Sequence, residues 1–479
     1  MDFIAKTMHG FESLLVKELE STGAKNIKPL RRAVSFSGDL EVLYRASYTC
    51  RTAIKILKST FQFKAKDEKE LYDRVKELPW EKHLDVDETF AIDSVVISER
   101  FKHSKYAALK MKDAIVDRFR QKAGRRPNIE TENPDLQLHL HISDDKINIS
   151  KDSSGESLHK RGYRSSGHAS PLNEILAAGM IMLSGWTKEH QLMDPMCGSG
   201  TVPIEAAMIA SNTPAGFLRQ EYAFMKWRDF DEELWNKVKA EENSKIDKSE
   251  IRIKASDFSG LYVRLARTAA TALGLDECIA FEKEDFFELD SDEGFVIMNP
   301  PYGERMTHNN IEDFYEEMAD HLKRYFAGCQ CWLISSNNEA LLRFGLKPSK
   351  RITLFNGPFQ CLFQKFELYK GSKKAKFQEG SIERAIKDFN EESAEDRPEP
   401  RVKRPSQGKD NRKERNAYSK PRKPREESEK TERPAVERQT KSGGLKWSRE
   451  TPRDKKPFTK GRDSNRRNPT KSSENPQKD

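Results

Sequence analysis

Two short motifs, far apart in the sequence, constrain this chain more than any other feature. The first has the form D-x-x-x-G-x-G at residues 194–200 and precedes a helical pattern from Thr201 to Ala210. The second, Asn299-Pro300-Pro301-Tyr302, follows an apolar run at residues 294–298. A strand that runs through a glycine turn into a helix directs backbone N–H groups toward a polar ligand. Because ligands bind at the carboxyl ends of strands in open α/β sheets, we expect one cleft for a cofactor and a planar, amino-bearing substrate.

A nicotinamide or flavin site is the first alternative for the glycine turn. That fingerprint requires a third glycine three positions after the second, where the helix packs closely on the strand. Here Gly198 and Gly200 are followed by Pro203 at that position. Proline is tolerated in a first helical turn, but it does not provide the close approach that glycine allows. The turn therefore favours another cofactor.

The turn resembles motif I of class I S-adenosylmethionine-dependent methyltransferases, and Asn299 to Tyr302 resembles their motif IV for amino groups. The amino nitrogen of a base is a poor nucleophile because its lone pair is delocalised into the ring. Fixed acceptors can bind its hydrogens and help to restore that lone pair. We expect the Asn299 side-chain oxygen and the Pro300 carbonyl to be these acceptors, and Tyr302 to stack on the extruded base.

The sequence between and after the motifs alternates as a doubly wound sheet requires. Strand patterns at 251–255, 278–281 and 329–334 alternate with helical patterns at 261–273 and 311–326. A hairpin pattern at 351–369 centres on Asn356-Gly357, a two-residue turn signal. We therefore predict the class I, Rossmann-like methyltransferase fold, with a mostly parallel sheet and a final antiparallel hairpin.

The resemblance implies roles for three acids at strand ends. Asp194 would lie near the methionine end of S-adenosylmethionine, Asp257 would accept both ribose hydroxyls, and Asp285 would accept the adenine amino group. The other cofactor residues implied are Gly198, Gly200, Thr201 and Phe286, the last beside the adenine ring. Residues 213–250 separate the turn from Asp257, so we expect them to form an insertion, placed over the cleft.

The N-terminal third has a different pattern. Residues 1–65 alternate short strands and helices in a ferredoxin-like α+β order, and residues 66–160 form a second α/β unit that resembles a THUMP RNA-binding domain. In this second unit we predict separate strands at 90–92 and 95–97 and a helix from Tyr106 to Arg120. The methyltransferase domain would then occupy residues 161–370.

Several segments together resemble one family, the bacterial 23S ribosomal RNA guanine-N2-methyltransferases that carry an N-terminal THUMP domain. These segments are Leu158 to Arg164, the Pro171-Leu172 helix start, Asp194 to Thr201 and Asn299 to Arg305. The likeness covers about residues 1–370. Some family members continue into a second methyltransferase domain, and we expect the activity of that domain to be absent here.

A basic-aromatic cluster lies where the binding module meets the catalytic domain. Its members are Lys160, Arg161, Tyr163 and Arg164. Such a cluster can bind phosphates and stack a base, so we predict that it contacts RNA, together with Arg305. An ordinary charged linker is the alternative. Basic residues on and after the predicted helix 106–120 are consistent with RNA binding, although a solvated helix face would look similar.

The net charge of the chain, +8, comes from its C-terminal segment. Residues 371–479 hold 32 Lys+Arg and 20 Asp+Glu, whereas residues 1–370 hold 53 and 57. The segment contains ten of the 22 prolines and few apolar residues, so we predict a disordered tail. Its excess of positive charge would contact RNA phosphates without sequence preference, unless it serves only solubility.

The six cysteines form no C-x-x-C pair and the histidines are not clustered, so a metal site is not expected. The sequence has no apolar signal segment and no long apolar run, and we expect a cytoplasmic monomer without membrane contact. The sequence thus predicts an RNA methyltransferase acting on a guanine N2 in 23S ribosomal RNA. Alternatives are a tRNA guanine-N2 or a nucleic-acid adenine-N6 methyltransferase, and an RNA-binding ribosome-assembly factor.

Overall fold

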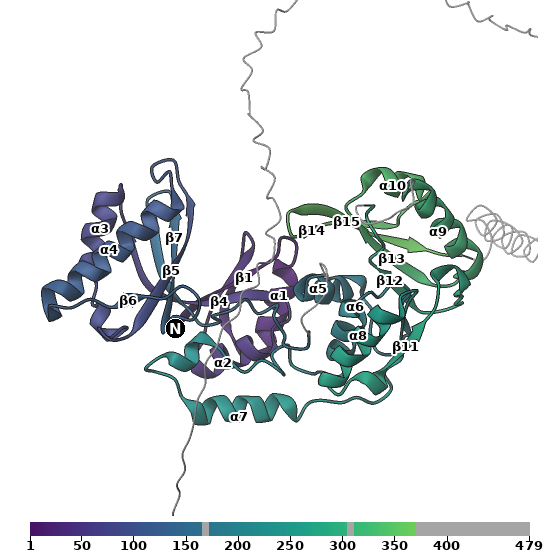
Figure 1. The fold of residues 1–479 in the computed structure, drawn as a ribbon, viewed down its shortest axis with the longest axis horizontal. Helices are drawn as coiled ribbons and strands as arrows, with labels where there is room; N and C mark the ends of the chain where they lie inside the picture. Colours follow the sequence, from purple (N-terminus) through teal and green to yellow (C-terminus); the bar gives the residue numbers. More distant parts are fainter. Residues whose placement is uncertain (165–171, 304–310, 370–479) are drawn as a thin grey trace, which may run out of the picture. The chain divides into compact units, whose positions relative to one another are not determined.

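A computed structural model describes residues 1–164, 172–303 and 311–369 of the protein (Figure 1). These residues form two mixed sheets, one of eight strands in the N-terminal part and one of seven strands in the remainder. The arginine at position 305 and the segment 371–479, both predicted to contact RNA, lie outside the described residues.

The eight-stranded sheet is shared by the two N-terminal units. Its spatial order is β2 (Lys25–Leu30), β3 (Ala33–Ser37), β1 (Asp2–Thr7), β4 (Ala53–Lys64), β8 (Lys146–Asp152), β7 (Leu136–Ser143), β5 (Thr89–Ile97) and β6 (Asn128–Ile129). Strand β4 is antiparallel to β1 on one side and to β8 on the other. The predicted ferredoxin-like and THUMP units therefore meet through strand pairing rather than through a free linker.

Helices cover this sheet where its strands present apolar side chains. The helical segments are α1 (Glu12–Ser21), α2 (Leu40–Thr49), α3 (Glu68–Glu77), η1 (Trp80–Lys82) and α4 (Ser104–Ala123). The alternate leucines of β7, from Leu136 to Leu140, join the buried cluster formed by α3 and α4. The two strands predicted at 90–92 and 95–97 form one continuous strand, β5. The polar residues Asp93 and Ser94 do not interrupt it, because they lie in the less buried part of the strand.

The seven-stranded sheet has the predicted methyltransferase topology. Its spatial order is β11 (Ile279–Lys283), β10 (Ile253–Asp257), β9 (Leu192–Asp194), β12 (Phe295–Met298), β13 (Gln330–Ser335), β15 (Phe359–Glu367) and β14 (Lys350–Asn356). The first five strands are parallel, and the last pair is an antiparallel hairpin whose register closes at Asn356 opposite Phe359. Gly357 has a φ of +60° in that turn, as the sequence signal required. The prediction of a doubly wound sheet with a final hairpin is confirmed.

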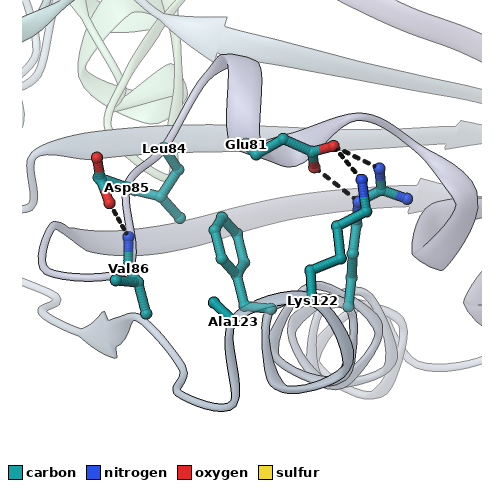
Figure 2. Close-up of a pocket in the computed structure, with 8 residues that line it drawn as sticks. Glu81, Leu84, Asp85, Val86, Lys122 and Ala123 are labelled. Atoms are coloured by element: carbon teal, nitrogen blue, oxygen red, sulfur yellow. Dashed lines mark hydrogen bonds and ion pairs between the residues drawn. The ribbon is translucent and has the colours of Figure 1, made fainter.

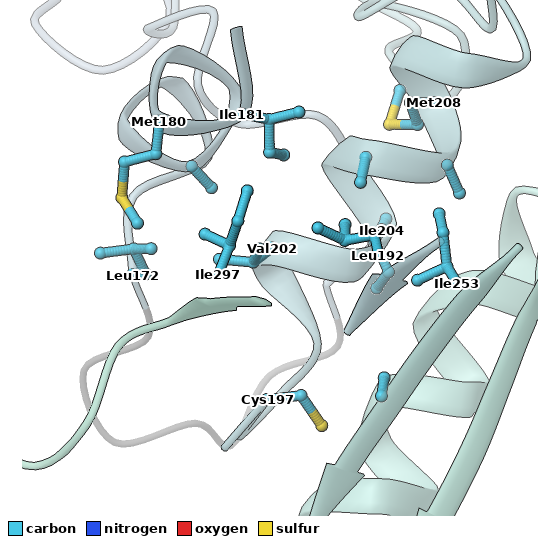
Figure 3. Close-up of a cluster of buried hydrophobic side chains, with 14 of the residues drawn as sticks. Leu172, Met180, Ile181, Leu192, Cys197, Val202, Ile204, Met208, Ile253 and Ile297 are labelled. Atoms are coloured by element: carbon cyan, nitrogen blue, oxygen red, sulfur yellow. The ribbon is translucent and has the colours of Figure 1, made fainter. Parts of the chain in front are cut away.

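Apolar residues on both faces of the central strands explain why helices flank this sheet on both sides. Leu192 and Ile297 point into one buried cluster, while Met193 and Met298 point into another. The flanking helical segments are α5 (Glu174–Ser184), α6 (Thr201–Ala210), α8 (Gly260–Ala272), η3 (Asp276–Cys278), η4 (Phe286–Glu288), α9 (Ile311–Tyr325) and α10 (Asn338–Arg343). Figure 3 shows the first cluster, in which Met180 and Ile181 of α5 and Ile204 of α6 lie in one group with Leu192, Ile253 and Ile297 of the sheet.

The segment 213–250, expected over the cleft, packs elsewhere. It contains η2 (Ala223–Lys226) and α7 (Glu232–Asn243). Trp235 of α7 makes edge-to-face contacts with Tyr44 and Tyr48 of α2, at ring-centroid distances of 5.8 and 5.5 Å. Each aromatic pair of this kind contributes about 0.5–1.5 kcal/mol beyond its buried area. The expectation of a cleft cover was wrong, because this aromatic face finds its apolar partners on the N-terminal domain.

Candidate active site

The glycine turn joins β9 to α6 at the carboxyl edge of the sheet. Gly198 and Gly200 have φ values of +52° and +80°, which other residues rarely adopt. A Cβ on Gly200 would lie 2.7 Å from the Ala266 Cβ of α8, so this glycine also allows close helix packing. A Cβ on Gly198 would meet nothing within 4 Å. The turn therefore opens at Gly198, beside the N-terminus of α6, which no side chain caps.

Two strand-end acids flank this opening. Asp194 is 2% exposed and its Oδ1 accepts a hydrogen bond from the Met196 N–H at 3.3 Å. Burial raises the pKa of Asp194 to about 8; the Met196 N–H opposes this shift and the nearby Asp257 charge adds to it.

Asp257 ties the end of β10 to the same turn. Its Oδ2 accepts the Gly198 N–H at 3.0 Å and its Oδ1 accepts the Ser259 N–H at 2.9 Å. Burial raises the pKa of Asp257, and these two N–H groups oppose the shift. The structure thus brings together Asp194, Gly198 and Asp257, as the sequence predicted.

The third acid lies at the edge of this constellation. Asp285 is exposed after β11 and caps η4, where its Oδ1 accepts the Phe287 N–H at 3.0 Å. Phe286, predicted beside the adenine ring, is 4% exposed and packs in the core against Phe326 and His321. The accessible ring of this pair belongs to Phe287, which is 37% exposed.

The Asn299-Pro300-Pro301-Tyr302 loop follows β12, which pairs with β9 in parallel. The Tyr302 hydroxyl donates to Asn299 Oδ1 at 2.6 Å, and the pKa of Tyr302 is raised by burial, with Cys361 and Tyr315 adding to the shift. An amide oxygen carries two lone pairs, so Oδ1 retains one for a second donor.

Neighbouring elements hold the backbone of this loop. The Tyr315 hydroxyl of α9 donates to the Pro301 carbonyl at 3.2 Å, and Asn337 Nδ2 donates to the Tyr302 carbonyl at 3.2 Å. Among the residues that the structure describes, none donates to the Pro300 carbonyl. Asn299 Oδ1 and the Pro300 carbonyl, at the end of the strand beside the glycine turn, are therefore two acceptors with capacity for a further donor.

Two residues of the basic-aromatic segment 160–164, Arg161 and Tyr163, are buried within the fold. Arg161 is 2% exposed; its guanidinium donates to the carbonyls of Leu158 and Arg51 at 2.7 and 2.6 Å and lies 3.4 Å from Glu205 Oε1. The Tyr163 hydroxyl, also buried, donates to the same Glu205 oxygen at 3.2 Å. Buried side chains cannot reach a phosphate, so the predicted RNA contacts of Arg161 and Tyr163 are corrected to structural ones.

The outer residues of this segment differ from each other. Arg164 is partly buried, with Nε 3.0 Å from Glu174 Oε1 and Nη2 2.9 Å from the Thr201 hydroxyl of α6. Thr201, predicted to bind the cofactor, thus has its side chain engaged by Arg164. Lys160 is exposed and pairs with Glu156 at 2.6 Å.

Two groups of residues around the site were not identified from the sequence. Phe258 is 73% exposed directly after the buried Asp257, and an aromatic that follows a strand-end acid was a signal that could have identified it. Tyr315 and Asn337 fix the loop from distant positions, and no local pattern could have assigned that contact.

The pocket in Figure 2 lies in the THUMP part, away from both motifs. Its lining includes Leu84, Phe119 and the ion-paired group of Glu81, Arg118 and Lys122. Glu81 binds Arg118 at 2.8 Å and Lys122 at 2.5 Å, which lowers the pKa of Glu81 and leaves these cations committed. Arg118 and Lys122 are therefore not available to bind an anion in this pocket.

Residues 1–164, 172–303 and 311–369 contain no group of three His, Cys, Asp or Glu side chains arranged to hold a metal ion. None of the helices in these ranges combines the length and apolarity that crossing a bilayer requires.

Three family models match consecutive parts of the chain. They are an RlmL ferredoxin-like domain at residues 2–57, a THUMP domain at 65–152 and an RMKL-like methyltransferase domain at 161–365. Two relatives, from Psychromonas ingrahamii and Syntrophotalea carbinolica, are named ribosomal RNA large subunit methyltransferase K/L. They are 36% and 35% identical over 77% and 76% of this chain. The chain spans about half of their length, 50% and 53%.

Solved structures cover the same region. One, described as a possible methylase from Clostridium difficile 630, is 30% identical, with a TM-score of 0.70 over 78% of this chain and 99% of that one. Another, solved in complex with SAH, is 28% identical, with a TM-score of 0.68 over 78% and 99%. A third, from Listeria monocytogenes, is described as a predicted N6-adenine-specific DNA methylase; it is 29% identical, with a TM-score of 0.68 over 78% and 96%.

Proposed function

Because the chain belongs to the methyltransferase family that joins an RlmL ferredoxin-like domain, a THUMP domain and an RMKL-like methyltransferase domain, we propose that it methylates the N2 amino group of a guanine in 23S ribosomal RNA. The methyl donor is S-adenosylmethionine. The observation that carries the proposal is the pair of acceptors, Asn299 Oδ1 and the Pro300 carbonyl, beside the Gly198 opening.

The residues at the opening fit this cofactor. The empty space at Gly198 and the uncapped N-terminus of α6 accommodate a polar ligand, and Asp257 offers carboxylate oxygens for the ribose hydroxyls. Asp194, at the end of β9, directly precedes the glycine turn. Asp285 is exposed, so its carboxylate is accessible to the adenine amino group. Phe258 and Phe287 supply the accessible aromatic faces. Thr201 would act through its backbone N–H, since its hydroxyl binds Arg164.

The loop residues perform the amino-group chemistry. When bound, the cofactor supplies an electrophilic methyl group on a positively charged sulfur. Asn299 Oδ1 and the Pro300 carbonyl accept the two hydrogens of the target amino group, which concentrates the lone pair on nitrogen and stabilises the positive charge that develops there. Tyr302 orients Asn299 through its hydroxyl and offers a ring to the extruded base. The displaced proton leaves to solvent.

The choice of substrate rests on the relatives and on the THUMP domain. Relatives that share 36% and 35% identity are named for ribosomal RNA, whereas one solved structure is described as a DNA adenine methylase. The acceptor pair suits guanine N2 and adenine N6 alike, so transfer RNA guanine and nucleic-acid adenine remain the alternative substrates.

We further propose that the protein acts as a cytoplasmic monomer, that its domains comprise residues 1–65, 66–160 and 161–370, and that residues 371–479 add salt-sensitive RNA contacts.

Nucleoside mapping tests this function. Ribosomal and transfer RNA from a deletion strain would be digested and analysed by mass spectrometry, before and after complementation with the wild-type gene or with Asn299→Ala. We expect one N2-methylguanosine to disappear from 23S ribosomal RNA and to return only with the wild-type gene. Loss of methylation in transfer RNA, or of N6-methyladenosine, would refute the substrate; an unchanged pattern in every RNA would refute the function.

A further inference from the structure

The cations around α4 divide into two groups by their partners. In the second half of the helix, Arg118 and Lys122 bind Glu81, and Arg120 binds Asp117. In the first half and the loop before it, the cations are Arg100, Lys102, Lys105, Lys110 and Lys112. Lys112 lies 2.9 Å from Asp113, and the other four have no acidic partner within the described residues. Residues 100–110 contain no aspartate or glutamate. The positive charge of this helix is therefore neutralised at one end and available at the other.

Exposed apolar groups accompany the unpaired cations. Tyr106 is 46% exposed and Leu109 is 50% exposed, and Lys110 Nζ lies 5.4 Å from the centre of the Tyr106 ring. A tyrosine ring on a surface can stack on a nucleotide base, and a neighbouring cation strengthens that contact. We name the four unpaired cations with Tyr106 and Leu109 the α4 patch.

The α4 patch rests on a rigid part of the THUMP fold. Phe101, between Arg100 and Lys102, is 1% exposed, and Ala107 and Met111 on the inner face of α4 are buried in the same cluster. The Ser94 hydroxyl of β5 donates to the Ser104 carbonyl at 2.9 Å, which ties the start of the helix to the sheet. The loop and the helix start therefore hold the patch in one orientation without a ligand.

We propose that the α4 patch is the surface on which the THUMP domain binds single-stranded RNA. The cations contact phosphates, and one unpaired base stacks on Tyr106. This inference rests on the proposed function for the identity of the RNA, but the surface itself follows from charge pairing and exposure. It replaces the segment 160–164, whose arginine and tyrosine are buried, as the accessible basic-aromatic site among the described residues.

Charge-matched variants of the full-length protein test the patch. Lys105→Gln/Lys110→Gln removes two unpaired charges, and Arg120→Gln/Lys122→Gln removes two paired, exposed charges from the same helix. Binding to an unmodified transcript of large-subunit ribosomal RNA would be measured against salt concentration. Each lost phosphate contact lowers the slope of log K against log salt by about 0.7, so we expect a decrease of about 1.4 for the first variant and none for the control.

The tyrosine supplies a second, salt-independent measurement. Tyr106→Ala should weaken RNA binding by roughly five- to a hundredfold, whereas Tyr106→Phe should bind as the wild type does, because the ring remains. Thermal midpoints equal to that of the wild type would verify the fold of each variant. Equal slopes for the two double variants, or full binding by Tyr106→Ala, would overturn the proposal.

Methyl transfer, measured separately, distinguishes this failure from failure of the proposed function. A wild-type protein that methylates the transcript while the patch variants bind normally would refute only the patch. A wild-type protein that binds through the patch without methylating any ribosomal RNA would refute only the function.

Discussion

The glycine turn at 194–200 and the segment at 160–164 are both short, charged and glycine-containing, yet they use their charges in opposite ways. The turn places the backbone of Gly198, which donates to Asp257 at the end of β10, at an opening where a Cβ would meet nothing. The segment directs Arg161 and Tyr163 inward onto Glu205, which has no exposed surface. Charged residues thus border an opening in one place and form an internal ionic contact in the other.

The fold explains this difference. The turn follows a parallel strand, and the carboxyl end of such a strand lies at the edge where a sheet leaves room for ligands. The segment follows β8 and passes beside α6, a helix that is buried along most of its length. A buried carboxylate such as Glu205 requires partners, and Arg161 and Tyr163 provide them. The position of a charged residue in the fold topology therefore determines its role, and the residue type alone does not.

Arg161→Ala should cause the largest effect of all, because it would leave Glu205 buried without its cation. Breaking a buried ion pair costs about 3–5 kcal/mol, which should lower the urea midpoint of the methyltransferase domain markedly. Lys160→Ala is the matched control, since an exposed pair contributes only about 0–1 kcal/mol. If Arg161→Ala had a normal urea midpoint but bound RNA more weakly, the segment would contact RNA as the sequence predicted. The contrast with the turn would then be wrong.

Asn299→Ala should reduce single-turnover methyl transfer by roughly two or more orders of magnitude. The estimate follows the ~10²–10³ cost of removing one polar group that stabilises transition-state charge. Affinity for S-adenosylmethionine and RNA should stay nearly unchanged, because the interaction develops during the reaction. Tyr302→Phe, which keeps the ring and removes only the hydrogen bond to Asn299, should have a smaller effect. Full transfer to unmodified ribosomal RNA by Asn299→Ala would contradict the catalytic assignment.

The sequence was sufficient for the seven strands of the methyltransferase sheet, whereas the short helix α10 had no predicted counterpart. Continuous apolar runs gave the parallel strands, and Asn356-Gly357 gave the hairpin with its register. Within the THUMP unit, local polarity at Asp93 and Ser94 divided one strand into two, because an exposed strand face tolerates polar residues. Pairing of β4 with β8 was not predictable, since contacts between residues so distant in sequence leave no local pattern.

The site was predictable where strand ends determine it and not where tertiary contacts do. Asp194, Asp257 and Asn299 lie at the ends of adjacent strands, as a doubly wound order requires. Burial of Phe286 and exposure of Phe287 depend on how α9 packs against η4, which periodicity does not encode. The same reason accounts for the error at Arg161: its partner is 44 residues away.

Asp257→Ala should weaken S-adenosylmethionine binding by roughly ten- to a hundredfold, since hydrogen bonds to a charged acceptor contribute about 1.5–3 kcal/mol. Glu277→Ala, an exposed acid just before β11 and so at the opposite edge of the sheet, is the control and should bind normally. Calorimetry would measure both. An unchanged affinity for Asp257→Ala would mean that the turn, like the segment, uses its charge only for folding.

Asp194 tests the turn through pH, with the smallest expected effect. Burial raises its pKa from 3.8 to about 8, so the folded chain keeps a proton that the unfolded chain loses near pH 4. This group therefore lowers stability as pH rises from about 4 to 8, and has no further effect above that range. A cationic cofactor beside Asp194 would favour the ionised carboxylate, so binding should release a proton and strengthen with pH, by at most about tenfold per unit below pH 8.

Calorimetry at pH 7 in two buffers of different ionisation enthalpy measures that proton directly. We expect the wild type to release more protons on binding S-adenosylmethionine than Asp194→Asn does. The variant also corrects for titration of the cofactor's own amino group, which both proteins experience equally. Identical proton release would place Asp194 out of electrostatic contact with the cofactor. The Asp194 carboxyl would then be a purely internal group, as Glu205 is. Only Asp257 would still distinguish the turn from the segment as a proposed cofactor acceptor.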